Sequence, residues 1–145
     1  MTTTQILLLV GVFLVMDTVI VGAIISAIVS SSFGVLAKKY PAVPMLPGAV
    51  YREFQDAAFG SSNFGKCVHI GVDENGLHLF PSAIIRWAGG KPATIPWTMV
   101  ELVPDTKNRR LVKCTLAGIK SRLPAWCFDV QTPATSGAAT QSPRA

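Results

Sequence analysis

The sequence predicts a single N-terminal transmembrane helix followed by a small, mainly-β domain that carries a short helix. The first observation is an apolar run from Ile6 to Ala37, which contains one ionisable residue, Asp17, and ends at Lys38-Lys39. The second is a set of short segments beyond residue 66 in which apolar and polar residues alternate between turn residues. A long apolar run indicates a membrane span, whereas alternation indicates half-buried strands.

Residues 1–39 are expected to form a retained transmembrane anchor. About 20 apolar residues cross a bilayer, so this longer run predicts a tilted span or a span with an ordered flank. A cleavable signal peptide needs a basic start, a short apolar core and a cleavage site. Residues 1–5 carry no charged side chain, the apolar run is too long, and no convincing cleavage site follows it.

The basic residues at the end of the anchor predict its orientation. Lys38 and Lys39 follow the apolar run, and no Lys or Arg precedes it. By the positive-inside rule, the chain crosses a bacterial inner (cytoplasmic) membrane once, with its N-terminus outside and its C-terminal domain in the cytoplasm. The odd number of cysteines, Cys67, Cys114 and Cys127, suits a reducing compartment.

The anchor carries small residues at every fourth position. They are Thr18, Gly22, Ser26 and Ser30. This spacing places a smooth stripe on one helix face, where a second helix can approach closely through dispersion and hydrogen bonds. We therefore expect the stripe to pack against helices of other integral membrane subunits.

Asp17 lies beside the start of this stripe. A carboxylate in hydrocarbon is costly, so it is expected to be protonated, paired or near an interface. A span from Thr18 to Ala37 would place Asp17 at the outer headgroups. A span that begins earlier would place it inside the bilayer, where it would pair with a partner helix or, as a third alternative, carry protons. The sequence leaves these alternatives open.

Residues 40–48 are expected to form a Pro-rich connector. Pro41, Pro44 and Pro47 restrict the backbone and donate no hydrogen bond, which predicts a stiff, extended link along the membrane surface. The cytoplasmic mainly-β domain is then expected over residues 49–130. Its first segment, residues 49–59, has apolar residues on one helical face and is predicted to form a short helix.

The centre of the domain predicts a β-hairpin. Residues 67–72 and 77–80 alternate around Asn75-Gly76, a dipeptide typical of tight hairpin turns. The face predicted to form the core consists of Val68, Ile70, Val72, Leu77 and Leu79. The opposite face carries Cys67, His69, His78 and Phe80. A second β-region is expected over residues 84–87 and 95–103.

Residues 111–116 and 119–123 predict a final hairpin with an apolar inner face and a basic outer face. The basic surface consists of Arg109, Arg110, Lys113, Lys120 and Arg122. All 13 Lys and Arg residues lie from Lys38 onward, whereas Asp17 is the only one of the 8 acidic residues before it. This excess of positive charge favours anionic lipid headgroups or an acidic protein face as a partner.

Two segments of this β-region carry a resemblance to known proteins. Val68–Leu79, with Glu74-Asn75-Gly76-Leu77, and Ala93–Val100, with Ile95-Pro96-Trp97, resemble small bacterial membrane-anchored proteins with a pleckstrin-homology-like (GRAM-type) domain. The resemblance implies a curved antiparallel sheet or partial barrel that binds lipid or protein, with no enzyme activity. Such domains usually end in an amphipathic helix. Here a polar tail, residues 131–145, is expected to be disordered unless a partner orders it.

No pattern in the chain predicts catalysis. Cys67, His69 and His78 share a strand face, but no fourth ligand accompanies them, so we expect no metal site, cofactor, catalytic residue or nucleic-acid partner. The chain is interpreted as a non-catalytic accessory subunit of a larger integral membrane complex, of the respiratory or photosynthetic type. Its anchor would dock on partner helices and its domain would brace the assembly. The alternative is a membrane-tethered module that binds anionic lipid headgroups.

Overall fold

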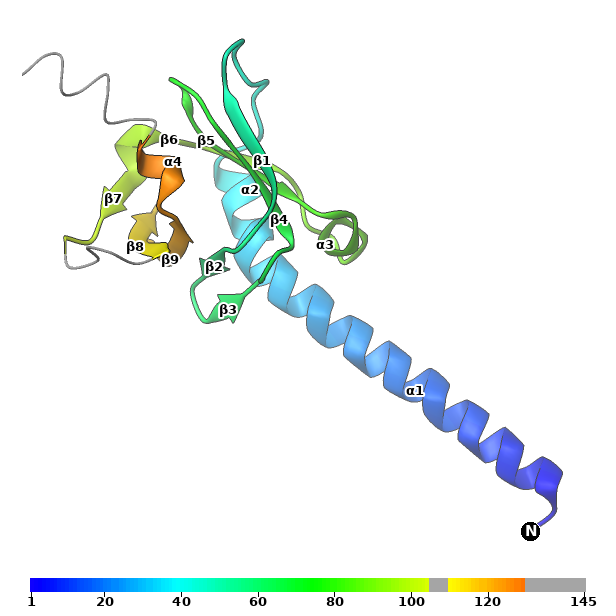
Figure 1. Cartoon of the computed structure of the whole chain (residues 1–145). Helices are drawn as coiled ribbons and strands as arrows, with labels where there is room; N and C mark the ends of the chain where they lie inside the picture. Colours follow the sequence, from blue (N-terminus) through cyan, green and yellow to red (C-terminus); the bar gives the residue numbers. More distant parts are fainter. Residues whose placement is uncertain (105–109, 130–145) are drawn as a thin grey trace, which may run out of the picture.

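The structure, a computed structural model, describes residues 1–104 and 110–129 as a long N-terminal helix joined to a small domain of two antiparallel sheets (Figure 1). The helix consists of α1 (Thr3–Val29), the π-helical turn η1 (Ser30–Gly34) and α2 (Val35–Lys39). Together these segments form one continuous helix that is long and apolar enough to cross a membrane.

The helix begins at a capping box and ends before a proline. The Thr2 side chain accepts a hydrogen bond from the Gln5 N–H, and the Gln5 side chain accepts one from the Thr2 N–H. These bonds satisfy backbone donors that the first helical turn leaves free. At the other end, Tyr40 leaves the helical conformation and is followed by Pro41, which has no N–H to continue the helix.

The last turns of this helix belong to the core of the domain. Val29, Phe33 and Leu36 are at most 2% exposed, and their spacing places them on one helix face. The Phe33 ring contacts the rings of Phe59 and Phe64, with centroids 5.2 Å apart in both pairs. The helix is therefore built into the domain and is not merely tethered to it.

The rest of the helix projects away from the domain. No residue from Ile6 to Ile28 is buried, and Figure 1 shows α1 leaving the domain towards the N-terminus. A membrane span from Thr18 to Ala37 does not fit this arrangement, because its last turns are packed against the domain. The packed turns also join the two parts that the sequence separates at Lys39.

The domain contains two sheets, whose strand orders are β1-β4-β5-β6 and β3-β2-β9-β8-β7, with antiparallel pairing throughout. The strands of the first sheet are β1 (Val50–Gln55), β4 (Val68–Val72), β5 (Gly76–Pro81) and β6 (Ala93–Pro96). Those of the second are β2 (Ala58–Phe59), β3 (Ser62–Asn63), β7 (Val100–Leu102), β8 (Leu111–Leu116) and β9 (Ile119–Pro124). The short helices are α3 (Ala83–Trp87), η2 (Trp97–Met99) and α4 (Trp126–Asp129). Within the described residues the sheets form no closed barrel.

Both predicted hairpins are confirmed. In the first, Val72 pairs with Leu77, and all five residues predicted to form its core face are buried. In the second, β8 and β9 pair around Ala117-Gly118, where φ is 51° and 86°. A two-residue turn with positive φ at both positions matches the natural twist of antiparallel strands.

The helix predicted over residues 49–59 is wrong, because this segment forms β1 and β2. The apolar spacing fits a helix, but β1 satisfies its backbone groups by pairing with β4, with Val50 opposite Val72. Tertiary pairing routinely overrides a local helical preference. The pairing is interrupted by a bulge between Arg52 and Gln55.

The strand predicted over residues 84–87 is also wrong, because these residues lie in α3. A short apolar run does not by itself distinguish a strand from a buried helical segment. Ser82 precedes the helix in an extended conformation, with φ −62° and ψ 169°, which is the backbone geometry of an N-cap residue. Ile85 is buried, whereas Ile84 is exposed, so α3 packs on the domain with one side only.

The Pro-rich connector, residues 40–48, lies against the first sheet. The Val43 N–H donates a hydrogen bond to Thr94 Oγ1 at 2.9 Å. The Leu46 N–H donates to Asp73 Oδ2, also at 2.9 Å. The expected link along a membrane surface is therefore corrected to a strap held on the domain itself.

The core lies between the two sheets and the end of the helix. α2 packs against β6, and Phe33 fills the space beside β2. In the pleckstrin-homology-like domains that the sequence resembles, a C-terminal helix usually covers the sheet. In the described part of this chain, the N-terminal helix provides that cover, and α4 is only 4 residues long.

Candidate functional site

The outer face of the second sheet carries the basic residues predicted from the sequence. Lys113 lies opposite Arg122 in the β8–β9 pairing. Lys120 lies two residues before Arg122, on the same face of the strand. All three side chains are exposed, as is Arg110 just before β8. Arg109 and the predicted tail lie outside the described residues.

These side chains line a groove made of three adjoining hollows. One of about 590 Å³ lies between the β2–β3 turn and the β8–β9 hairpin. Another of about 590 Å³ lies beside β1 and α4. A smaller one of about 230 Å³ lies between them and shares Leu111 with both. The cations that line the hollows define the basic groove: Arg52, Lys66, Arg110, Lys113, Lys120 and Arg122.

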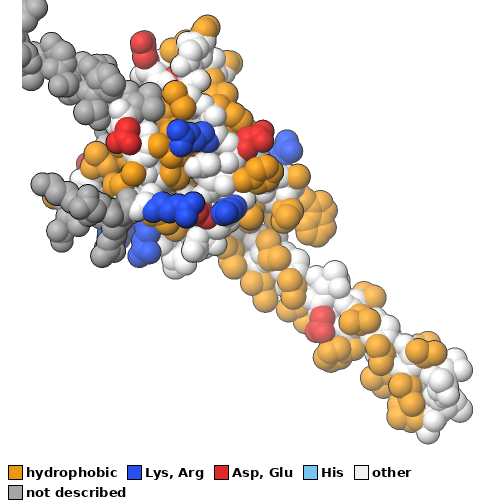
Figure 2. Space-filling view, viewed as in Figure 1, with side chains coloured by type: hydrophobic (Ala, Val, Ile, Leu, Met, Phe, Trp, Pro, Cys, Tyr) orange, Lys and Arg blue, Asp and Glu red, His pale blue; other side chains and the backbone are white. Residues whose placement is uncertain are grey.

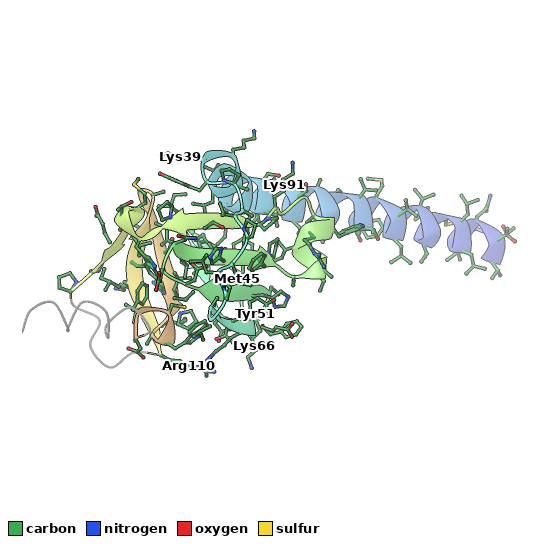
Figure 3. The ribbon with its side chains drawn as sticks, turned by 90° about the horizontal axis from the view of Figure 1, so that it is seen from above. Lys39, Met45, Tyr51, Lys66, Lys91 and Arg110 are labelled. Atoms are coloured by element: carbon green, nitrogen blue, oxygen red, sulfur yellow. The ribbon has the colours of Figure 1, made fainter. Side chains whose placement is uncertain are left out.

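The figures show how charge is distributed over the molecule. Figure 2 shows apolar side chains along the free part of the helix and Lys and Arg side chains gathered on the domain. Figure 3 shows Lys66 and Arg110 on the same side of the domain, away from Lys39 and Lys91. The basic groove is therefore a localised feature of one side of the domain.

The basic groove has little negative charge of its own. Asp56 is its acidic lining residue. Between described residues, the one contact of a carboxylate with a basic side chain within 4.0 Å joins Asp73 and His78, at 2.8 Å, so none of the six cations has a carboxylate partner there. Lys113 and Arg122 face each other across the strands, and like charges in such pairs destabilise a sheet. An anion bound in the groove would reduce this repulsion.

One end of the groove is held by an aromatic contact that sequence reasoning missed. The Arg52 guanidinium lies 4.7 Å from the centroid of the Trp126 ring. The Trp126 indole N–H donates a hydrogen bond to Gln55 Oε1 at 2.9 Å. A guanidinium over a tryptophan ring is a favourable cation–π arrangement, which orients Arg52 towards the groove. No local pattern connects these residues, because the fold joins β1 to α4.

A second candidate region lies on the free part of α1. Asp17 is eleven residues from Ile6 and eleven from Ile28, so it marks the middle of the exposed apolar segment. It makes no polar contact with another described residue. The structure thus places the carboxylate far from both ends of this segment.

The small-residue stripe continues from Asp17 towards the domain. The Thr18 hydroxyl donates to the Leu14 carbonyl at 2.8 Å, which satisfies it within the helix. Open space lies beside Gly22. Ser26 is half-buried where α1 approaches the domain, and Ser30 begins the π-helical turn beside it. Three of the four stripe residues therefore lie on the free segment.

A buried polar network connects the strap to the first sheet. His78 is fully buried, with Nε2 2.8 Å from Asp73 Oδ2 and Nδ1 2.9 Å from Thr94 Oγ1. These two oxygens also accept the hydrogen bonds from Leu46 and Val43 of the strap. Burial acts to raise the pKa of Asp73, but hydrogen bonds from Leu46 and His78 outweigh it and hold the pKa below its ordinary value.

The cysteine and histidine residues do not converge on one site. Within the described ranges, no group of three His, Cys, Asp or Glu side chains is arranged to hold a metal ion. His69 Nδ1 accepts a hydrogen bond from the Phe54 N–H at 3.1 Å. Burial raises the pKa of Cys114 and of Cys127 to about 12, which keeps both thiols protonated and poorly nucleophilic.

Comparison with known proteins identifies no relative of this chain. No protein-family model, no curated protein and no solved structure matches this chain. The resemblance to pleckstrin-homology-like proteins therefore rests on its two short sequence segments alone.

Proposed function

We propose that this protein is a non-catalytic, single-pass membrane protein that acts as an accessory subunit of a larger integral membrane complex. The observation that supports this most directly is the position of Asp17 in the middle of the exposed apolar segment. In this proposal the Asp17 side chain contacts a helix of the partner subunit, and the domain at the end of the helix braces the assembly in the cytoplasm.

The length of the free segment supports a position of Asp17 deep in the bilayer under this proposal. The 23 residues from Ile6 to Ile28 form a helix about 35 Å long, compared with a hydrocarbon core of about 30 Å. A modest tilt accommodates the difference and leaves the central residue near the midplane. A carboxylate there costs about 2.5–3.5 kcal/mol on insertion scales, so such residues usually face a partner or a polar cavity.

The stripe of small residues provides a surface for that partner. Thr18 and Gly22 follow Asp17 along the helix, and no described residue covers them. Close approach of a second helix along this face would bring its polar groups within reach of the carboxylate. Because the helix end is buried in the domain, a partner that fixes α1 also fixes the domain.

The proposed orientation places the domain in the cytoplasm and the N-terminus outside. All Lys and Arg residues lie on the domain side of the free segment, as the positive-inside rule requires. Lys38 and Lys39 lie in the last turn of the helix, at the far end of the packed turns. The three free thiols suit a reducing compartment.

The test is the size of the particle extracted from native membranes in mild detergent. The wild-type chain is expected to migrate with a large complex, and Asp17→Leu is expected to release it while α1 stays inserted. Met16→Leu, at the adjacent position, is the matched control and should keep the association. Migration of the wild-type chain alone, with no co-purifying subunit in mass spectrometry, would count against the proposal.

The basic groove favours a second candidate, a tethered module that binds anionic lipid headgroups. One wall of the groove is the β2–β3 turn, and Phe59 of β2 contacts Phe33 at the end of the helix. The groove is therefore near the point where the anchor joins the domain. Migration as a monomer or small oligomer, together with salt-sensitive retention of anionic lipid, would favour this candidate over the subunit.

A further inference from the structure

α3 lies on the side of the domain from which α1 leaves. Figures 1 and 3 both show it beside the departing helix, at the end of the domain nearest the free segment. It follows β5 directly, so it lies at the opposite end of the β4–β5 hairpin from the Asp73 turn. If α1 crosses a bilayer, α3 is the part of the domain that faces it.

The exposed side of α3 is strongly apolar. Trp87 is 80% exposed and Ile84 68% exposed, the two highest values among large apolar side chains in the described residues after Lys39. Arg86, which lies between them in sequence, is also exposed. Exposed aromatic and aliphatic side chains next to a cation are typical of a surface that lies at a membrane interface.

The backbone around α3 holds the side chains of Ile84 and Trp87 in place. Ile85 is 4% exposed and belongs to the domain core. The Gly90 N–H donates to the Ile85 carbonyl at 2.8 Å, and a Cβ at Gly90 would collide with Ile85. The chain can therefore fold back tightly only with glycine at this position, and α3 is fixed with Ile84 and Trp87 pointing away from the core.

We propose that α3 is a second membrane contact, in which Ile84 and Trp87 enter the boundary between headgroups and acyl chains of the leaflet next to the domain. The proposal rests on the proposed function, in which α1 spans the bilayer. The Trp ring prefers this boundary because its apolar part contacts acyl chains there while its N–H finds a hydrogen-bond acceptor. The Arg86 guanidinium is placed to reach lipid phosphate. Because the end of the helix is packed into the domain core, a span and a second contact together restrict the tilt of the helix and the domain relative to the bilayer.

The experiment uses the full chain in nanodiscs made of phosphatidylcholine and phosphatidylglycerol, with bromine atoms on the acyl chains close to the headgroups. Tryptophan fluorescence is expected to be quenched, and Trp87→Phe should remove most of this quenching. Trp126 lies in α4, at the opposite end of the domain from α3 (Figure 1), and Trp97 binds the Asp73 carbonyl at 2.8 Å. Trp126→Phe is therefore the matched control, which should leave the quenching unchanged.

The outcomes separate this proposal from the one it rests on. If α1 is inserted, as flotation with the nanodiscs shows, but bromine does not quench Trp87, the α3 contact is rejected and the proposed function stands. If the chain does not associate with the bilayer, the proposed span is rejected as well. If an aqueous quencher is excluded from Trp87 in native membranes but reaches it in nanodiscs, a partner protein covers α3 and the lipid contact is rejected.

Discussion

Two parts of one helix both present apolar side chains but have opposite surroundings. Phe13, on the free segment, is 62% exposed, whereas Phe33, twenty residues further on in the packed turns, is 0% exposed. Both lie in the same apolar run, from Ile6 to Ala37. An apolar side chain is buried equally well by lipid and by a protein core, so composition does not reveal which of the two surrounds it. The length of an apolar run is therefore an upper limit for the length of a span.

The largest expected effect comes from the packed turns. Phe33→Ala removes a fully buried ring that contacts Phe59 and Phe64, and should destabilise the domain by about 3–5 kcal/mol. Chemical unfolding of the detergent-solubilised chain, followed through the domain tryptophans, measures this. Phe13→Ala is the matched control and should leave the domain unchanged. Equal unfolding midpoints for both variants would show that the helix end is not part of the core.

The next effect concerns the strap that joins the helix to the sheet. The two carboxylate oxygens of Asp73 accept hydrogen bonds from Leu46, His78 and the following turn. Asp73→Asn replaces one of these oxygens with an NH₂ group, which cannot accept them. The substitution should lower the free energy of unfolding by about 1–3 kcal/mol. Glu74→Gln, at an exposed neighbouring position, is the control and should be neutral.

The effect of Asp73 should also depend on pH. Its pKa is lowered on folding from the ordinary value of 3.8, so its stabilisation is complete above that pH and is lost as the pH falls through the lower folded value. The difference in unfolding free energy between wild type and Asp73→Asn should be constant near neutral pH and shrink below about pH 4. A difference that grows in acid would contradict this account.

A smaller effect is expected on the free segment. Gly22→Leu and Ser26→Leu should weaken helix association by about 1–2 kcal/mol without preventing insertion. Val21→Leu and Ile25→Leu, on neighbouring positions of the same turns, should have no effect. Association in the membrane can be measured by energy transfer or by retention in the extracted complex. If all four variants behave alike, no specific helix face is involved.

The smallest effect per residue is expected in the basic groove. Each of Lys113, Lys120 and Arg122 should contribute about 1 kcal/mol to contact with an anionic leaflet or partner, and salt should screen it. Replacement of all three by Gln should abolish salt-sensitive retention of phosphatidylglycerol by the full chain, measured by native mass spectrometry. Lys91→Gln is the control, because Lys91 is exposed and lies on the other side of the domain from the groove (Figure 3). The full chain is required, because cutting at Tyr40 would remove Phe33 from the core.

The sequence identified the two hairpins correctly because their signals are local. Alternation around Asn75-Gly76 and around Ala117-Gly118 sets both the turn and the faces of the strands. The prediction from sequence was wrong for residues 49–59 and 84–87, where a few apolar residues fit both the helical and the strand period. In residues 49–59 the choice between helix and strand depends on pairing with a distant strand, and in residues 84–87 it depends on which isoleucine the rest of the domain buries. Neither contact can be read from the neighbouring residues.

By itself, the sequence determined that the chain begins with one long apolar helix, that a small β domain follows, and that positive charge gathers on the domain. These properties depend on composition and on periodicity over a few residues. Only the tertiary structure decided where the free helix ends, which places Asp17 at its centre, and which cations share a groove with Trp126. The reason is physical: burial and long-range contact depend on which surfaces meet, and residues far apart in the chain decide that together.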